Sequence, residues 1–454
     1  SDIKYFGGEF TMKRIEEWAN KLIASKIDPD LYSRYNVKRG LRNSDGSGVL
    51  VGLTGVGDVH GYIVDEGEAS PVEGRLRYRG IDVKDLTVGF QNEKRFGFEE
   101  TAFLLMFGYL PEKDELKDFS DSIASNRELP EGFKENMIFR APSKDIMNKL
   151  ARSVLTLYSY DENPEDRSIK NVLRQCIELI ARFPALVAYG FQAKQHYFEG
   201  SSLYIHNQQE SLSTAENFLS IVRPNKEYSS TEAEILDLAL VLHAEHGGGN
   251  NSTFTVHVVA STDTDTYSSI GAAVGSLKGP KHGGANHSVS MMMQDIMTNV
   301  KEVSNESSLK EYIRKIFRKE AFDRTGLIYG MGHAVYSLSD PRAILLKAKA
   351  KELAKEKGRE EEFSLYEEVE RLGKIVFEEE KGSKVICANI DFYSGFVYDM
   401  LGIHPDLHTP IFAMARIAGW ASHLIEEIVS GGRIMRPAYK YVLPPQKYVP
   451  LNER

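Results

Sequence analysis

Apolar residues recur at three- and four-residue spacing along most of this chain, a spacing that is typical of amphipathic α-helices. The clearest stretches are residues 12–27, 98–107, 170–181, 213–222 and 233–243. Gly108 follows the second stretch and Pro184 the third, and both are helix-stop signals. Patterns that could form short strands are confined to residues 61–65 and 439–443. The sequence therefore predicts an all-α protein with very little strand.

One internal segment differs in composition. Residues 341–380 are the most charged part of the chain, and the Ala/Lys/Glu-rich stretch 347–358 is typical of a solvated helix. Because this segment lies between two glycine-rich loops, we expect a smaller helical domain beside a large one.

Charge and cysteine content narrow the class of protein. The net charge is −9, so no overall attraction to nucleic acid or to an anionic membrane is expected. No apolar run approaches the ~18–20 residues of a membrane span, and the N-terminus carries no signal or transit pattern. Cys176 and Cys387 lie in apolar surroundings and are expected to be free thiols. These features predict a cytoplasmic protein that binds any anionic substrate through a local cationic cluster.

Two histidines precede a run of three glycines and an Asn pair. His243 and His246 are expected to share a face at the end of a helix, before residues 247–251. The spacing is not H-E-x-x-H, and no third metal ligand has a recognisable position. A helix end with favourable His side chains before a glycine stop is the alternative. The glycine run favours backbone that approaches a small ligand closely.

A second glycine-rich turn, residues 275–286, carries His282 after a predicted helix at 270–277. We expect His282 to open the next helix, where the dipole disfavours the imidazolium and keeps the ring neutral as a donor. Lys278 and Lys281 flank it. A connector with an incidental histidine is the alternative.

The segment 330–342 combines a glycine hinge with a helix start. Asp340 and Pro341 are typical N-cap and first helical residues. Arg342 therefore falls in the first turn, where its charge opposes the macrodipole. An anion that bridges Arg342 and the free backbone N–H groups would explain this placement, and His333 could reach the same anion. A solvent-exposed arginine is the alternative.

Two ionisable residues have apolar neighbours near the C-terminus. Asp391 precedes an aromatic-rich helix, where desolvation could raise its pKa and make it a general base; a plain N-cap is the alternative. Arg416 lies in an otherwise apolar helix, and a buried guanidinium requires a protein carboxylate or an anionic ligand. Arg433 and Arg436 follow.

The sequence lacks the motifs of several common enzyme classes. The chain has no P-loop or dinucleotide fingerprint and no G-x-S-x-G nucleophile elbow. Histidines, one aspartate and arginines remain, without a nucleophile or a complete metal site. This inventory suits proton abstraction next to a carbonyl on a polycarboxylate substrate.

Taken in order, these segments resemble the citrate synthase family. The similar blocks are H-x-x-H-G-G-G-N at 243–250, G-P-K-H-G-G-A-N at 279–286, G-H-A-V at 332–335 with D-P-R at 340–342, and N-I-D-F-Y-S-G at 389–395. Arg416 in its apolar helix, Arg436-Pro437 and residues 73–82 complete a resemblance that spans about 54–441.

The resemblance implies a fold and a reaction. Members are almost entirely helical homodimers in which a small mobile domain, here 285–397, closes over a large domain, here 1–284 and 398–454. The implied reaction condenses acetyl-CoA with oxaloacetate, hydrolyses citryl-CoA and is the first step of the tricarboxylic acid cycle. Acetyl-CoA is a substrate, so neither a cofactor nor a metal is expected.

The resemblance also implies residue roles. His282 and Asp391 would enolise acetyl-CoA, and His333 and Arg342 would polarise the oxaloacetate carbonyl. Oxaloacetate or citrate would be bound by His246, Asn250, Arg342, Arg416 and Arg436 of the partner subunit. The CoA contacts are less defined: candidates are Gly330, Met331, Gly332, Lys278, Lys281 and Lys384.

Two departures and several alternatives stay open. Gly247 stands where many members carry an acidic residue, and Ser337 where many carry a basic residue that helps to bind CoA. 2-Methylcitrate synthase uses the same residues on propionyl-CoA, and one methylene is worth only ~1–3 kcal/mol in an apolar pocket. A citryl-CoA lyase, a metallohydrolase and a helical scaffold or sensor are the remaining alternatives.

Overall fold

The structure is a computed structural model that describes residues 15–24, 26–43, 46–65, 68–382 and 385–453. The chain divides into two compact units, Ser1–Leu53 and Thr54–Arg454. The first unit contains α1 (Ile15–Ala24) and α2 (Asp30–Arg34). The first predicted helix, 12–27, thus corresponds to the shorter α1 within the described residues.

The second unit is mainly helical, and the predicted all-α class is confirmed. Its elements are β1 (Gly57–Asp65), β2 (Glu68–Tyr78), β3 (Ile81–Asp82), α3 (Val83–Asn92), α4 (Phe98–Phe107), α5 (Lys113–Ser125), α6 (Ile146–Leu157), α7 (Ile169–Glu199), α8 (Thr214–Val222), α9 (Ser230–His243), α10 (Asn251–Ala260), α11 (Thr266–Lys278), α12 (Ala285–Asn299), α13 (Glu306–Phe317), α14 (Pro341–Lys357), α15 (Glu360–Lys381), α16 (Ile390–Met400) and α17 (His408–Ser430). Among the described helices, none combines the length and the hydropathy that a membrane span needs.

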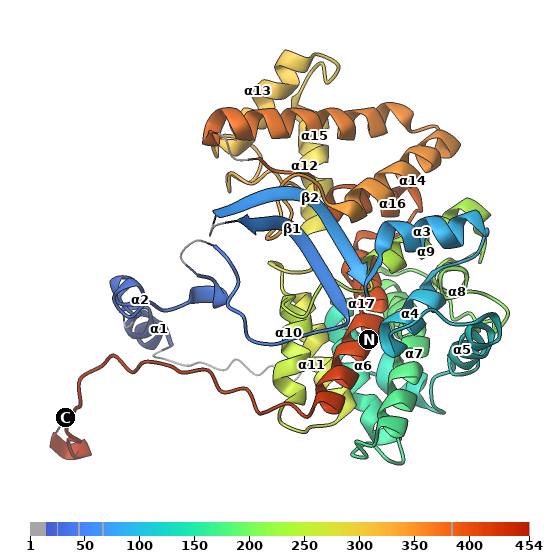
Figure 1. The fold of residues 1–454 in the computed structure, drawn as a ribbon, viewed down its shortest axis with the longest axis horizontal. Helices are drawn as coiled ribbons and strands as arrows, with labels where there is room; N and C mark the ends of the chain where they lie inside the picture. Colours follow the sequence, from blue (N-terminus) through green and yellow to red (C-terminus); the bar gives the residue numbers. More distant parts are fainter. Residues whose placement is uncertain (1–14, 25, 44–45, 66–67, 383–384, 454) are drawn as a thin grey trace. The chain divides into compact units, whose positions relative to one another are not determined.

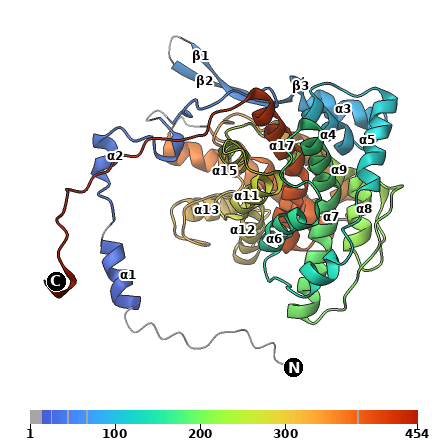
Figure 2. The same cartoon turned by 90° about the horizontal axis from the view of Figure 1, so that it is seen from below.

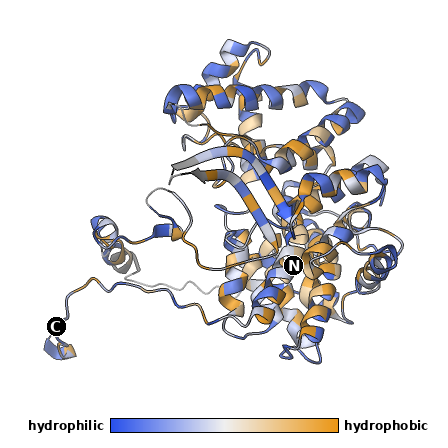
Figure 3. Ribbon diagram, in the orientation of Figure 1, coloured by the Kyte–Doolittle hydropathy of each residue, from blue (hydrophilic) through white to orange (hydrophobic). Residues whose placement is uncertain are grey.

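Helix α17 forms the centre of the helical packing (Figure 1). It packs on α4, α7, α9, α10 and α11, and nearly every residue from Ile411 to Leu424 is buried. The helices around it are predominantly hydrophobic in Figure 3. A helix that is apolar on every side is typical of a protein interior, and Arg416 therefore lies in the core.

The strands form one antiparallel sheet in the order β1-β2-β3. In Figure 2 the β1–β2 hairpin runs along one edge of the helices, and β2 packs on α3, α4 and α14. The predicted strand at 61–65 is confirmed as the end of β1. The predicted strand at 439–443 is wrong: the chain there pairs with no strand among the described residues, and Tyr439 is 95% exposed.

Two predicted helix ends have different outcomes. Gly108 ends α4 as expected, with φ of 88° and its N–H donating to the Leu104 carbonyl at 2.8 Å. The predicted stop at Pro184 is wrong, since α7 is 31 residues long and Pro184 lies inside it. Proline removes one backbone hydrogen bond, but residues 183–193 are all buried, and this burial stabilises the continuous helix.

Helices α12 to α16 form a group in the upper part of Figure 1. Within the group, α12 packs on α16, α13 on α15, and α14 on both α15 and α16. Helix α14 also contacts α9 and α3. The group falls in the same part of the sequence as the predicted small domain, 285–397, whose boundaries and motion stay predictions.

Candidate active site

Arg416 projects from the middle of α17 and is completely buried. Its Nε donates to the His243 carbonyl at 2.6 Å, and its guanidinium lies 4.7 Å from the centre of the Phe412 ring. Its Nη1 and Nη2 have no hydrogen-bond partner among the described residues. Unmade hydrogen bonds at a buried charge are unfavourable, so these two groups mark a place for an anionic ligand.

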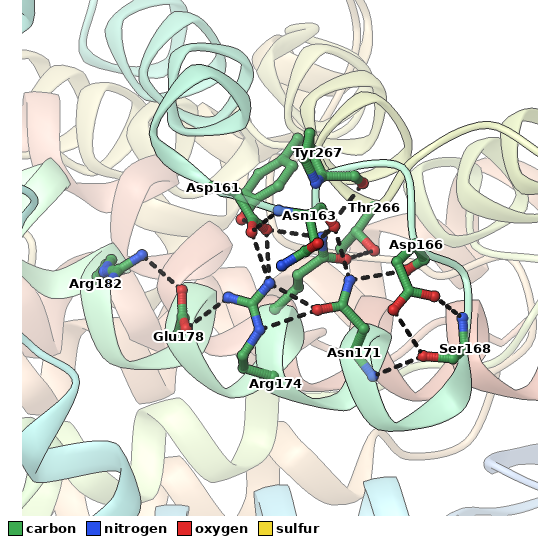
Figure 4. A network of polar contacts seen from close by, with 12 residues as sticks. Asp161, Asn163, Asp166, Ser168, Asn171, Arg174, Glu178, Arg182, Thr266 and Tyr267 are labelled. Atoms are coloured by element: carbon green, nitrogen blue, oxygen red, sulfur yellow. Dashed lines mark hydrogen bonds and ion pairs between the residues drawn. The ribbon is translucent and has the colours of Figure 1, made fainter.

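Arg174 on α7 shows how the same protein satisfies a structural arginine (Figure 4). Its Nη2 contacts both carboxylate oxygens of Asp161, at 2.7 and 2.8 Å, and its other nitrogens reach Asn171 and Glu178. Asp161 also accepts from the Tyr267 hydroxyl at 2.8 Å. Every nitrogen of Arg174 has a protein acceptor, which makes the unpartnered terminal nitrogens of Arg416 distinctive.

His246 is a second buried group without a protein partner. Its Nε2 has no hydrogen-bond partner among the described residues. Burial holds its pKa well below the usual range, and the charges of Arg342 and Arg416 act in the same direction. The ring is therefore neutral. His243 does not share a helix face with it as predicted, because α9 ends at His243 and His246 lies in the following loop.

His333 faces His246 across the site. The two ring centres are 5.0 Å apart, with the rings nearly perpendicular at 86°. The Nδ1 of His333 accepts from the backbone N–H groups of Val335 and Tyr336, both at 3.1 Å. These two bonds place the proton of a neutral ring on Nε2, so His333 can donate a hydrogen bond from that atom.

Arg342 lies in the first turn of α14, as predicted, but its counter-charge belongs to the protein. Asp340 caps the helix by accepting from the Arg342 backbone N–H at 3.0 Å. The same carboxylate accepts from the Arg342 Nε at 3.0 Å and Nη2 at 2.7 Å. The Asp340 N-cap and the Pro341 start are confirmed. A bidentate partner holds the guanidinium in one orientation.

Asp391 is the second residue of α16, and its N-cap is Asn389, which accepts from the Asp391 backbone N–H at 3.0 Å. The alternative of a plain N-cap aspartate is therefore wrong. Burial raises the pKa of Asp391 to about 6, against the opposing charges of Arg342 and Arg416. A carboxylate with this pKa is ionised at neutral pH and can accept a proton.

The glycine hinge links His333 to the Asp391 turn. The Gly332 N–H donates to the Cys387 carbonyl at 2.7 Å, and the Asn389 side chain donates to the Gly332 carbonyl at 2.9 Å. Gly330 has φ of +75°, and a β-carbon there would lie 2.8 Å from the Phe392 Cα. The hinge needs glycine because the Asp391 helix packs directly against it. Its predicted CoA contact stays a prediction.

His282 lies at a helix N-terminus, but not the predicted one. Helix α12 begins three residues later, at Ala285. The His282 Nε2 instead lies 3.3 Å from the Ser252 backbone N–H and 3.0 Å from its hydroxyl, at the start of α10. The Trp420 indole donates to the same hydroxyl at 3.1 Å. Burial and the charge of Arg416 lower the His282 pKa to about 4, which keeps the ring neutral.

None of the remaining predicted residues that the structure describes is buried. Asn250 is the N-cap residue of α10, and its Oδ1 accepts from the Ser252 hydroxyl at 3.0 Å. Lys278 is exposed, 3.6 Å from the Asp145 carboxylate, and Lys281 and Arg436 are also exposed. Lys384 lies outside the described residues.

Three buried residues of the site were not predicted. Glu245 contributes a negative charge near Arg416 and is fully buried. The Tyr78 hydroxyl donates to the Val241 carbonyl at 2.9 Å, and the Tyr336 ring stacks on His333 with centres 4.7 Å apart. The position of Glu245 between two histidines was a usable signal. The tyrosines join the site through contacts distant in sequence, which carry no local signal.

The arrangement combines two chemical capabilities. The unpartnered terminal nitrogens of Arg416, with the unpartnered Nε2 of His246 nearby, can bind a carboxylate-bearing ligand. A partly buried carboxylate at Asp391, the neutral imidazole of His282 and the Nε2–H of His333 can move a proton and donate hydrogen bonds to oxygens that gain charge. Together they suit carbon-acid chemistry on a small polycarboxylate.

Comparisons with known proteins agree with this geometry. The family profile for the citrate synthase C-terminal domain matches residues 47–438. Citrate synthase 2 of Bacillus subtilis is 37% identical over 391 residues, 85% of this chain and 95% of that protein. A 2-methylcitrate synthase of Shewanella oneidensis is 31% identical over 381 residues, 84% of this chain and 92% of its own.

A solved structure is similar over nearly its whole length. It is the ternary complex of citrate synthase from Thermoplasma acidophilum with carboxymethyl coenzyme A and oxaloacetate. The TM-score is 0.72 at 25% sequence identity, with 92% of this chain and 99% of that chain covered. The profile match, the identity and the shared fold show that this chain belongs to the citrate synthase family of acyltransferases.

Proposed function

We propose that this protein condenses acetyl-CoA with oxaloacetate and hydrolyses the product to citrate and CoA. Two observations together carry the proposal: the terminal nitrogens of the buried Arg416 have no hydrogen-bond partner among the described residues, and the pKa of Asp391 is raised. The first requires an anionic ligand, and the second provides a base at neutral pH. Family membership supports both substrates.

In the proposed first step, the Asp391 carboxylate removes a proton from the acetyl methyl group. The negative charge that develops on the thioester oxygen is stabilised by a hydrogen bond from His282. The Ser252 N–H at His282 Nε2 favours the tautomer with its proton on Nδ1, which is then the donor. A positioned base contributes typically ~10²–10⁴-fold, and losing one oxyanion donor costs ~10²–10³-fold.

In the second step, the enol carbon attacks the oxaloacetate carbonyl carbon and a C–C bond forms. The His333 Nε2–H, fixed by the two backbone bonds to Nδ1, donates to the carbonyl oxygen and transfers its proton as the alkoxide develops. Arg416, His246, Asn250 and Arg342 bind the carboxylates. Water then cleaves the citryl-CoA thioester and releases CoA. No step requires a cofactor.

We further propose a homodimer in which Arg436 of the partner subunit completes each site. After α17 the chain runs extended, away from the helices (Figure 1). Arg436 is exposed on this arm, and so are Tyr439 and Tyr441. Exposed aromatic side chains on an extended arm are typical of a segment that binds another surface. The buried free thiols Cys176 and Cys387 support our proposal of a cytoplasmic location.

The proposed reaction is tested by free-thiol release. Purified protein is mixed with oxaloacetate and acetyl-CoA, and with each substrate alone. We expect thiol release only when both substrates are present. Release from acetyl-CoA alone would indicate a simple thioesterase, and no release from the mixture would rule out the condensation.

Propionyl-CoA is the matched alternative substrate, because one relative is a 2-methylcitrate synthase. Faster turnover of propionyl-CoA would assign that activity instead. One methylene changes binding by only ~1–3 kcal/mol. The kcat/KM values for acetyl-CoA and propionyl-CoA are therefore measured in the same preparation and compared.

The pH dependence of kcat/KM for acetyl-CoA should follow the ionisation of Asp391. Its pKa is about 6, so the ionised base increases as pH rises through 6. The His282 pKa is about 4, and its neutral form is already complete in that range. We expect log kcat/KM for acetyl-CoA to rise with unit slope below pH 6 and to level off above it. A profile that falls between pH 5 and 7 would contradict the role of Asp391.

A further inference from the structure

Two histidines without a role in the condensation meet ring to ring beneath the site. His257 comes from α10 and His423 from α17, and both are buried. The His257 Nε2 lies 3.1 Å from the His423 Nδ1, with ring centres 5.1 Å apart.

The outer nitrogen of each ring faces a carboxylate. The His257 Nδ1 is hydrogen-bonded to Glu427 Oε2 at 2.7 Å, whereas the His423 Nε2 lies 3.0 Å from Glu245 Oε2 without a hydrogen bond. A carboxylate that is hydrogen-bonded to one ring nitrogen favours a proton on that nitrogen. His257 therefore presents the lone pair of its Nε2 to the His423 Nδ1. A cation between these two inner nitrogens could accept one lone pair from each ring.

A third ligand atom points to the same place. The Glu426 Oε1 is buried, has no hydrogen-bond partner among the described residues, and lies 3.8 Å from the His423 Nδ1. The other oxygen of Glu426 accepts from the Gly55 N–H at 2.7 Å, which fixes the carboxylate. The ligand atoms of His257, His423 and Glu426 all lie within 4.8 Å of one another.

We propose that His257, His423 and Glu426 bind a divalent transition-metal ion of the zinc class. Metal–nitrogen bonds of about 2.0–2.1 Å at a tetrahedral angle separate two ligand atoms by about 3.3 Å. The observed 3.1 and 3.8 Å lie on either side of this value. Two imidazoles and one carboxylate form a ligand set that zinc accepts, with water in the fourth position. Glu427, which accepts from the His257 Nδ1, is the outer carboxylate that orients this histidine.

The ion would act as a structural link between α10 and α17. Gly248 lies directly on the pair: a β-carbon there would be 3.6 Å from His423 Cε1 and 3.8 Å from His257 Nε2. Metal binding would therefore hold the loop 247–250, which connects His246 to the start of α10. The inference does not depend on the condensation, since no proposed step uses the ion.

The test begins with the unmodified full chain. After EDTA treatment and removal of the chelator, ZnCl₂ is titrated by calorimetry, and CoCl₂ is titrated by visible absorption. We expect one Zn²⁺ per chain, the absorption of tetrahedral Co²⁺, and a melting temperature that rises with Zn²⁺ concentration. Glu427→Gln, which removes an outer carboxylate, should weaken binding ~10–100-fold. Glu426→Gln should weaken it further.

His196→Gln is the matched control, because His196 is an exposed histidine on α7 that bonds the Ser201 carbonyl. It should bind Zn²⁺ like the wild type. Failure of the unmodified protein to bind Zn²⁺ would overturn the proposal, and the inner nitrogens would then share a proton. Equal binding by the wild type and folded Glu426→Gln would overturn it as well.

Discussion

Replacing Asp391 with asparagine is expected to lower kcat by ~10²–10⁴-fold and, at pH 7, to raise the free energy of unfolding by about 1–3 kcal/mol. The activity falls because an amide cannot accept the methyl proton. The stability rises because burial gives Asp391 a pKa of about 6, above the ordinary value of 3.8. Between these two values the folded chain holds more protons than the unfolded chain, so the free energy of unfolding falls as pH rises. Asparagine carries no charge, so the free-energy cost of holding an ionised carboxylate at this position is absent from the variant.

Thiol release and urea unfolding at pH 5 and pH 8 measure both effects. The stability gain should be larger at pH 8, where the wild-type carboxylate is ionised. Asp399→Asn is the matched control on the same helix, because the Asp399 side chain is 65% exposed and pairs with Arg359. It should change neither kcat nor the pH dependence of stability appreciably. An Asp391→Asn variant that keeps most of its activity would refute the base assignment.

Arg416→Met is expected to reduce kcat/KM for oxaloacetate by ~10²-fold or more, with no loss of stability in the absence of ligand. Hydrogen bonds to charged groups contribute ~1.5–3 kcal/mol each, and two terminal nitrogens are available. Burial lowers the pKa of Arg416 to about 10 in spite of the negative charge of Glu245, so the folded state disfavours this cation, and its replacement is not expected to lower the free energy of unfolding. Oxaloacetate should raise the melting temperature of the wild type and not that of the variant.

Arg174→Met supplies the contrasting case. Its guanidinium is paired with Asp161 and Glu178 (Figure 4), so the same substitution should lower stability and leave the KM for oxaloacetate unchanged. If both variants lost stability equally and both kept the wild-type KM, the terminal nitrogens of Arg416 would not be a ligand site.

The parts of the fold that local sequence determines were predictable. Helices α4, α8 and α9 follow the apolar spacing closely, and Gly108 ends α4 because a left-handed residue is required there. Pro184 misled the prediction because tertiary burial outweighed a local helix-stop signal. The final strand was mispredicted because strands need a pairing partner, which a single segment does not reveal.

The site was predictable where chemistry is concentrated in one residue. An arginine in an apolar helix and an aspartate after an apolar run are anomalies that sequence displays directly; Arg416 is fully buried and Asp391 partly buried in the same unit. His282 was assigned to the wrong helix, since its Ser252 contact joins residues 30 positions apart. The Asp340 partner of Arg342 was taken only as an N-cap, because one carboxylate serves both purposes.

The hydrogen bonds of Asn389 couple the glycine hinge to the helix that carries Asp391. Its backbone and side chain both bond the glycine hinge, and it also caps the helix that carries Asp391. In the proposed reaction, Asn389 thus joins the base, Asp391, to the glycine hinge that carries the proton donor, His333. Arg416 lies on α17, and His282 lies in the turn between α11 and α12. If the proposed roles hold, a displacement of the Asn389 linkage would move the base and the proton donor together, and both proton transfers would be lost at once.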